Sequence, residues 1–170
     1  MLFSKALLPL ALLASSVVGD GNTIRVAMKR ITGDTADLGK TVSSWHGDLF
    51  GALPVVGKAA ALLASLKHGT HTARASTALT TDETLVIATS TQELSDQVNK
   101  TLQAVIDAKP KFDHLFVSPL IHLTLEVEKG AADDFSNALL KKVPKDLQSI
   151  AEELIKGIMN NFQKALDAYA

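Results

Sequence analysis

Cysteine is absent from the 170-residue chain, and aromatic residues are scarce. Without cysteine there is no disulfide, no thiol nucleophile and no cysteine-based zinc site. Aromatic residues make up 5% of the chain, whereas hydrophobic residues as a whole make up 46%, with alanine and leucine prominent among them. Such an aliphatic, alanine-rich composition favours helices over sheets. The fold must therefore be stabilised by packing helices against one another.

A large excess of either charge is also missing. The chain has 17 Lys and Arg against 18 Asp and Glu, a formal net charge of -1. This balance provides no basic patch for nucleic acid and no polybasic segment for an anionic membrane. Beyond the N-terminus no apolar run is long enough to cross a bilayer, so we expect no transmembrane segment. The length suits one domain with a substantial core.

Residues 1–19 are typical of a cleaved secretory signal peptide. A short positive segment ending at Lys5 precedes an apolar run, and small or tolerated residues precede a cleavage site after Gly19. Cleavage after Ser16 is the alternative. We expect residues 20–170 to be secreted as a single helical domain.

Apolar residues recur at helical spacing along the rest of the chain and predict an all-α bundle of five amphipathic helices. Thr80 and Glu83 form a capping-box signature at the start of the third helix, and Pro110 ends it. Short breaks between the helices favour antiparallel neighbours. The expected helices span residues 24–45, 56–77, 80–109, 111–142 and 147–169.

The fourth of these regions leaves two points open. Gly130 would give a sixth helix if it divides the region, and Ser118 with Pro119 would cap a helix that starts there. Residues 121–128 alternate apolar and polar side chains, a pattern typical of a strand. We favour a helix because an isolated strand would have no partner elsewhere in the chain.

Three sequence features carry a resemblance to a known family. They are Lys109-Pro110-Lys111-Phe112-Asp113 with the long segment after it, Val143-Pro144, and a final helix ending in Ala168-Tyr169. With the signal peptide and the lack of cysteine, residues 79–169 resemble the hydrophobic surface-binding protein A family, also described as fungal cell-wall galactomannoproteins. The resemblance implies a helical bundle that is secreted or resides in the cell wall. It also implies binding to hydrophobic surfaces or fatty-acid-like lipids, and secreted hydrolases as partners.

Two features bear on the location and modification of the protein. Members of this family often carry a Ser/Thr-rich glycosylated tail, which this sequence does not show, so we expect a freely secreted form. Asn99-Lys100-Thr101 is a glycosylation sequon that secretion would make usable. Asn99 falls near the edge of an apolar stripe, where partial burial would block attachment of a glycan.

Small residues within the apolar stripes predict room for an acyl chain between the helices. Each CH₂ group moved there from water contributes roughly 0.8 kcal/mol. Close packing of two helices is the alternative reading of the small residues, and Ser95 or Thr124 would either bind a head group or bond its own helix backbone. A bundle without disulfides would also be able to open and spread on a hydrophobic solid. The candidate ligand-binding residues are Ala73, Ala88, Ser95, Phe112, Phe116, Leu120, Leu123 and Thr124.

Catalytic and cofactor signals are weak. His68 with His71, and His122 with Glu126, have spacings that suit two metal ligands, but each pair lacks a third ligand in the sequence. Neither a GxSxG motif nor a phosphate-binding glycine loop is present. We therefore expect no enzyme, no metal and no cofactor. The alternative to apolar binding is a structural or antigenic cell-wall mannoprotein whose packed bundle holds no small molecule.

Overall fold

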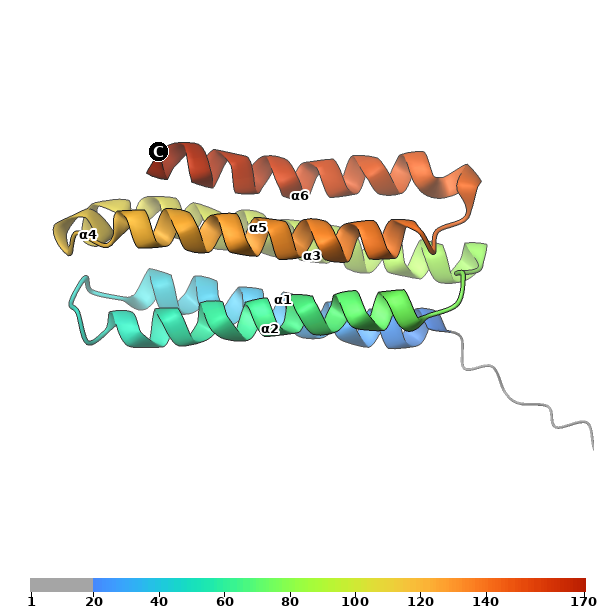
Figure 1. Ribbon diagram of the computed structural model, residues 1–170, viewed down its shortest axis with the longest axis horizontal. Coiled ribbons are helices and arrows are strands. Elements are labelled where there is room, and N and C mark those ends of the chain that lie inside the picture. The colour runs from blue at the N-terminus through green and yellow to red at the C-terminus, as the bar shows by residue number, and fades with distance from the viewer. Residues whose placement is uncertain (1–19) are drawn as a thin grey trace, which may run out of the picture.

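The computed structural model describes residues 20–170, which form six α-helices, one 3₁₀-helix and no strand (Figure 1). The predicted all-helical bundle is confirmed, whereas the predicted signal peptide at residues 1–19 lies outside the described residues. The elements are α1 (Asp20–Ser44), α2 (Ala52–Ala75), α3 (Thr81–Asp107), α4 (Lys109–His114), α5 (Ser118–Leu140), η1 (Lys145–Leu147) and α6 (Gln148–Tyr169).

The five long helices form a closed ring. Going around it, α1 packs against α2, α2 against α5, α5 against α6, α6 against α3, and α3 against α1. The chain runs back and forth along the bundle, so α1 and α3 run in the same direction, as do α2 and α5 (Figure 1). A ring of five helices leaves a space along its axis, which side chains from every helix must fill to reach the density of a protein interior.

The predicted capping box is confirmed, and it also joins two helices. Glu83 N donates to Thr80 Oγ1 at 3.2 Å, and Thr80 N donates to the Glu83 carboxylate at 2.9 Å. The same carboxylate accepts a bond of 3.3 Å from Gly21 N at the start of α1. Hydrogen bonds from Thr80, followed by that from Gly21, lower the pKa of Glu83 because they favour its charged form.

The fourth region is divided, but the break lies at residues 115–117 and not at Gly130. α5 continues through Gly130, where an added Cβ would meet no other atom within 4 Å. Pro119 lies in the first turn of α5, where its missing N–H costs nothing, and it could not have extended α4. Val117 is the N-cap instead of Ser118, whose hydroxyl bonds to Asp113. The strand-like residues 121–128 are helical.

Aromatic side chains close the end of the bundle beside α4. Trp45 and Phe112 stack with ring centroids 4.5 Å apart, and Tyr169 lies 6.3 Å from Phe112. The Tyr169 hydroxyl donates to Val105 O at 2.7 Å, which fixes the end of α6 against α3. These contacts hold the last turn of the chain in the core.

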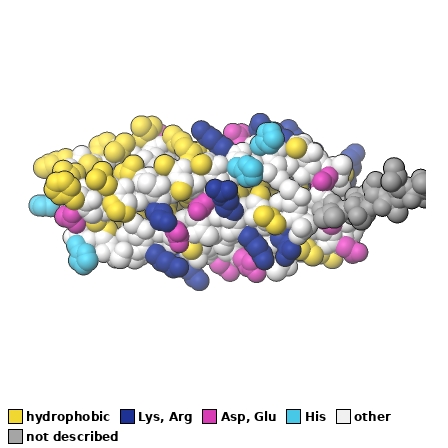
Figure 2. Space-filling model, turned by 90° about the horizontal axis from the view of Figure 1, so that it is seen from below, with side chains coloured by type: hydrophobic (Ala, Val, Ile, Leu, Met, Phe, Trp, Pro, Cys, Tyr) yellow, Lys and Arg dark blue, Asp and Glu magenta, His cyan; other side chains and the backbone are white. Residues whose placement is uncertain are grey.

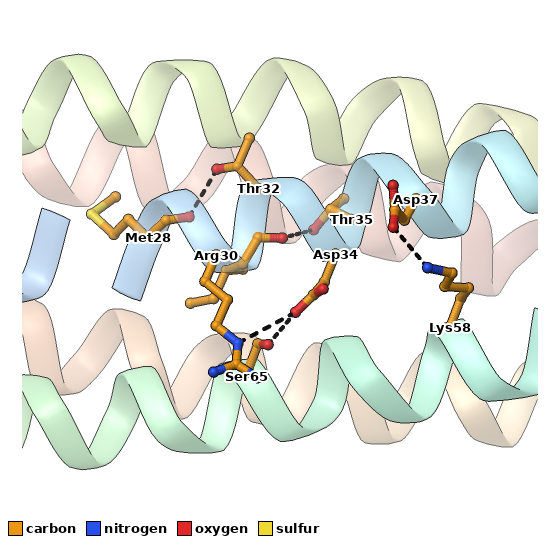
Figure 3. Close-up of polar contacts among 9 residues, drawn as sticks. Met28, Arg30, Thr32, Asp34, Thr35, Asp37, Lys58 and Ser65 are labelled. Atoms are coloured by element: carbon orange, nitrogen blue, oxygen red, sulfur yellow. Dashed lines mark hydrogen bonds and ion pairs between the residues drawn. The ribbon is translucent and has the colours of Figure 1, made fainter. Parts of the chain in front are cut away.

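Polar contacts set the register of α1 against α2 (Figure 3). Lys58 Nζ lies 2.7 Å from Asp37 Oδ2 and lowers the pKa of that carboxyl. The Ser65 hydroxyl donates to Asp34, which also lies near Arg30 (Figure 3). Because Lys58 and Asp37 are each almost half exposed, their ion pair adds little to stability and mainly orients the two helices.

Candidate functional site

A small cavity lies in the middle of the ring and is lined by all five long helices. Its volume is about 40 Å³. Most of its wall is aliphatic or aromatic, with Leu38, Leu66, Val98, Phe135 and Phe162 as examples from the successive helices. Because these lining side chains are mostly large, the cavity results from the ring arrangement of the helices and not from small residues.

A groove of about 300 Å³ between α2 and α5 leads toward this cavity. Its rim includes Val56 and Leu123, which are both exposed. The groove and the cavity share four lining residues, namely Leu38, Val105, Leu125 and Glu128. The two spaces are therefore neighbours, separated by the side chains that line both of them.

The polar groups that line the cavity and the groove are of two kinds. Thr35 Oγ1 donates to Ile31 O at 2.7 Å, and Thr101 Oγ1 donates to Thr35 O at 2.8 Å, so both hydroxyls are satisfied. Glu128 is only 4% exposed, and its Oε1 has no hydrogen-bond partner within residues 20–170. Burial raises the pKa of Glu128 to about 8, because an apolar environment penalises the charged form. Its carboxyl is therefore protonated at neutral pH.

Sequence reasoning missed Glu128 because it followed the wrong face of α5. The predicted ligand-binding residues Leu120 and Leu123 are 54% and 55% exposed, so they lie on the outer face of α5. The buried stripe instead runs through Leu125, Glu128 and Phe135. An acidic residue at helical spacing between apolar residues was the signal that could have identified it.

The structure brings together only some of the predicted ligand-binding residues. Phe112, Leu123 and Thr124 line the groove, and the Thr124 hydroxyl donates to Leu120 O in its own helix. Phe116 and Leu120 lie outside the groove lining. Three of the predicted residues therefore share one site.

The small predicted residues lie elsewhere. Ala73 is fully buried in the core, and Ser95 is partly buried without lining the cavity or the groove. Ala88 lines a separate apolar hollow of about 60 Å³ between α3, α5 and α6, together with Leu85 and Ile150. Ala73, near the end of α2, and Ala88, near the start of α3, lie toward the end of the bundle opposite α4, which carries Phe112 (Figure 1).

Exposed apolar side chains gather at the end of the molecule that carries the α1–α2 loop and the α4–α5 turn (Figure 2). Phe50 is 82% exposed and Phe116 is 90% exposed. Phe116 also has a φ of 58°, a left-handed conformation that costs a bulky residue roughly 1–2 kcal/mol. We call this surface the apolar tip; it comprises Leu49, Phe50, Leu53, Phe116 and Leu120.

The histidines lie at the surface. His68 and His71 are exposed, and His122 Nε2 lies 3.5 Å from Glu126 Oε1. Over residues 20–170, no group of three or more His, Cys, Asp or Glu side chains is placed to hold a metal ion. In the same part of the chain, no helix has the length and apolar character needed to cross a membrane.

The model of the family described as hydrophobic surface binding protein A matches residues 21–141. The chain belongs to this family. Among curated relatives, it is 30% identical over 139 residues to cell wall mannoprotein 1 of Aspergillus fumigatus, covering 82% of this chain and 48% of that protein. Its identity to cell wall mannoprotein 1 of Aspergillus flavus is 26% over 168 residues, or 99% of this chain and 61% of the relative. The chain thus spans roughly half to three fifths of these relatives.

Solved structures of similar proteins share the family fold. The crystal structure of Afmp4p in complex with palmitic acid matches with a TM-score of 0.85 at 21% identity, covering 88% of this chain and 99% of that one. Ligand binding domain 2 of the Penicillium marneffei MP1 protein, complexed with multiple arachidonic acids, matches with a TM-score of 0.83 at 21% identity. That match covers 88% of this chain and 95% of the other. At such identities the likeness shows a common fold.

Proposed function

We propose that this protein is a non-catalytic binding protein that holds a fatty-acid-like lipid between α2 and α5. The observation that carries the proposal is the apolar groove between these helices, which shares the lining residues Leu125 and Glu128 with the central cavity. Transfer of an acyl chain from water into this groove is favourable by roughly 0.8 kcal/mol for each CH₂ group, before association costs are subtracted. Proteins of the same fold that are described with palmitic or arachidonic acids support this ligand class.

The size of the two spaces indicates that α2 and α5 separate when the lipid enters. A cavity of about 40 Å³ has room for one or a few water-sized groups, and the groove of about 300 Å³ is larger. An acyl chain that passes from the groove toward the axis of the ring therefore needs the lining side chains to move outward. The proposal therefore includes a separation of α2 and α5 when the lipid binds.

The α2–α5 contact is suited to such a movement. No hydrogen bond or ion pair joins these two helices within residues 20–170, whereas every other adjacent pair in the ring has at least one. Beyond the helix ends, Lys142 Nζ donates to Arg74 O at 3.1 Å and fastens the end of the contact opposite the apolar tip. At the tip end no such bond joins α2 to α5 among the described residues, and the contacts there run from Trp45, after α1, to Lys111 and Phe112 of α4. The bonds of the other pairs are Lys58–Asp37, Thr101–Thr35, Tyr169–Val105 and Lys129–Gln163.

A second activity, adhesion to hydrophobic surfaces, is supported by the apolar tip. A contiguous exposed apolar surface is a common mark of a protein that contacts another apolar surface. The tip lies at the end of the bundle where the groove rim is exposed, so a lipid would pass from the surface into the groove without crossing water. Phe116 combines a strained φ with a ring that is 90% exposed, in keeping with a surface contact.

Secretion, residence in the cell wall and cooperation with secreted hydrolases are further parts of this proposal. The cell wall mannoproteins among its relatives support the first two. Glycosylation at Asn99 also belongs here, and the exposure of Asn99 on α3 removes the objection that burial would block a glycan.

The lipid-binding proposal is tested by native mass spectrometry of the delipidated protein mixed with palmitic acid. The wild type is expected to form a 1:1 adduct. Ala59→Trp, on the groove wall, fills the groove and reduces the adduct, whereas Ala64→Trp, exposed on the same helix outside the groove, does not. If the wild type forms no adduct, the structural mannoprotein alternative is favoured. Equal adducts in both variants would place the lipid outside this groove.

A further inference from the structure

Glu128 is a buried acidic residue whose side chain makes no hydrogen bond or ion pair in the part of the chain that the structure describes. It lies on the buried face of α5, between Leu125 and Ala132, and lines both the groove and the cavity. Among residues 20–170, its Oε1 has no hydrogen-bond partner and none of the four ion pairs includes it. A buried polar group without a partner costs free energy that a leucine at the same position would not.

The surroundings of Glu128 contain no charge that could compensate it. Among the described residues that line the cavity and the groove, from α1, α2, α3, α4, α5 and α6, Glu128 is the one titratable group. Its neighbours on α5 face away: Glu126 is exposed, and Lys129 bonds to Gln163 of α6. The ion pair that joins α1 to α2, Asp37 with Lys58, is almost half exposed to solvent. The buried carboxyl therefore keeps its proton at neutral pH, as its raised pKa indicates.

A protonated carboxyl has one O–H donor and one carbonyl acceptor side by side. The chemical group that satisfies both at once is another carboxyl, through two parallel hydrogen bonds. A charged carboxylate also fits, since it accepts a short, strong bond from the Glu128 O–H. An ester offers an acceptor only, and a hydrocarbon offers neither.

We propose that Glu128 is the specificity-determining residue of this site and that its un-ionised carboxyl binds the carboxyl head group of a free fatty acid. This inference rests on the proposed function, because it needs a lipid in the groove. It predicts that the protein distinguishes free fatty acids from their esters. It also predicts weaker binding once Glu128 ionises, because two carboxylates cannot share one apolar site without a proton between them.

The experiment compares palmitic acid with methyl palmitate, by displacement of a fluorescent apolar probe from the delipidated protein at pH 7 and pH 9.5. The wild type is expected to bind the acid about tenfold more tightly than the ester at pH 7, the effect of one satisfied hydrogen bond. This preference disappears at pH 9.5. Glu128→Leu is expected to lose the preference for the acid at pH 7.

Two further variants make the test selective. Glu128→Gln keeps an N–H donor that does not titrate, so its affinity for palmitic acid changes with pH only through the ligand itself. Glu126→Gln removes an exposed carboxyl from the same helix and is expected to behave as the wild type. If Glu128→Leu fails to fold by circular dichroism, the comparison of Glu128→Gln with the wild type across pH decides the question.

The outcomes separate the two proposals. If Glu128→Leu retains the preference and pH profile of the wild type, the role of Glu128 is wrong, while lipid binding stands. If the wild type binds neither palmitic acid nor methyl palmitate, the proposed function fails and the inference fails with it.

Discussion

At the scale of single residues, the buried Glu128 links the stability of the fold to pH. Its pKa is about 8 in the native state against an ordinary value of 4.5. Below pH 4.5 the carboxyl is protonated in both the native and the unfolded chain. Between pH 4.5 and about 8 the native chain keeps a proton that the unfolded chain has lost, so raising the pH favours unfolding. Above pH 8 the carboxyl is ionised in both states, so the free energy of unfolding falls no further.

Glu128→Gln is therefore expected to gain stability over the wild type as the pH rises from 5 to 8. The difference in unfolding free energy should grow by about 1 kcal/mol per pH unit, and urea unfolding of both proteins at several pH values measures it. All other groups titrate equally in the two proteins, so they cancel. If the unfolding free energies of the two proteins change in parallel with pH across this range, Glu128 is not desolvated in the native state.

Two glycines of α1 should respond in opposite ways to the same substitution. A Cβ on Gly39 would lie 2.6 Å from Thr101 Oγ1 and 3.3 Å from the Thr101 Cα, so Gly39→Ala forces α1 and α3 apart. Gly33 has no atom within 4 Å of that position. We expect Gly39→Ala to destabilise by about 1–3 kcal/mol and Gly33→Ala to stabilise by up to about 1 kcal/mol in thermal unfolding. A gain of stability in both would mean that the α1–α3 contact is not close at Gly39.

At the scale of helices, the α2–α5 contact differs from the others because it depends on apolar packing alone. Apolar contacts have no fixed direction and allow two helices to move apart around a guest, whereas a hydrogen bond such as Thr101 to Thr35 O fixes the α1–α3 spacing. The bonds of Lys142 near the end of α5 hold the far end of the contact closed. We therefore expect the opening to be largest near the apolar tip.

The lack of cysteine allows this opening to be measured with pairs of spin labels on introduced cysteines. Labels at Ala61 on α2 and Glu126 on α5, both exposed, are expected to report a longer distance when palmitic acid is added. Labels at Lys40 on α1 and Lys100 on α3 should report no change. An unchanged α2–α5 distance in a sample that has bound the lipid would exclude separation of these helices.

At the scale of the whole molecule, the two ends of the bundle differ in their apolar surface. The apolar tip combines side chains from the α1–α2 loop, the start of α2 and the α4–α5 turn, segments far apart in sequence (Figure 2). At the other end, Leu85 and Ile150 are exposed beside the small hollow between α3, α5 and α6. Adhesion through the tip would hold the protein end-on.

The double variant Phe50→Ser with Leu53→Ser is expected to adsorb less to polystyrene beads than the wild type. Both side chains are largely exposed, so the unfolding temperature should change little. Leu85→Ser with Ile150→Ser removes two similarly exposed apolar side chains from the opposite end and serves as the matched control. Equal loss of adsorption in both variants would show that adhesion depends on general hydrophobicity and not on the tip.

Local features of the sequence were sufficient to predict the helices. Periodic apolar residues, the Thr80–Glu83 capping box and Pro110 act within a few residues of chain, and the structure follows them at α3 and α6. Of the two possibilities left open in the fourth region, α5 does start at Ser118 and Pro119, whereas Gly130 does not divide it, because a glycine with free space around it does not interrupt a helix that is packed on its other side.

The site itself depended on the tertiary structure. α5 carries apolar residues on two faces, and only its packing between α2 and α6 decides that Leu125 and Glu128 turn inward while Leu120 stays at the surface. The sequence alone determined the all-helical fold, because helix periodicity and capping are local. The ring of five helices, its cavity and the buried acid were decided by contacts between residues distant in the chain, which no local pattern encodes.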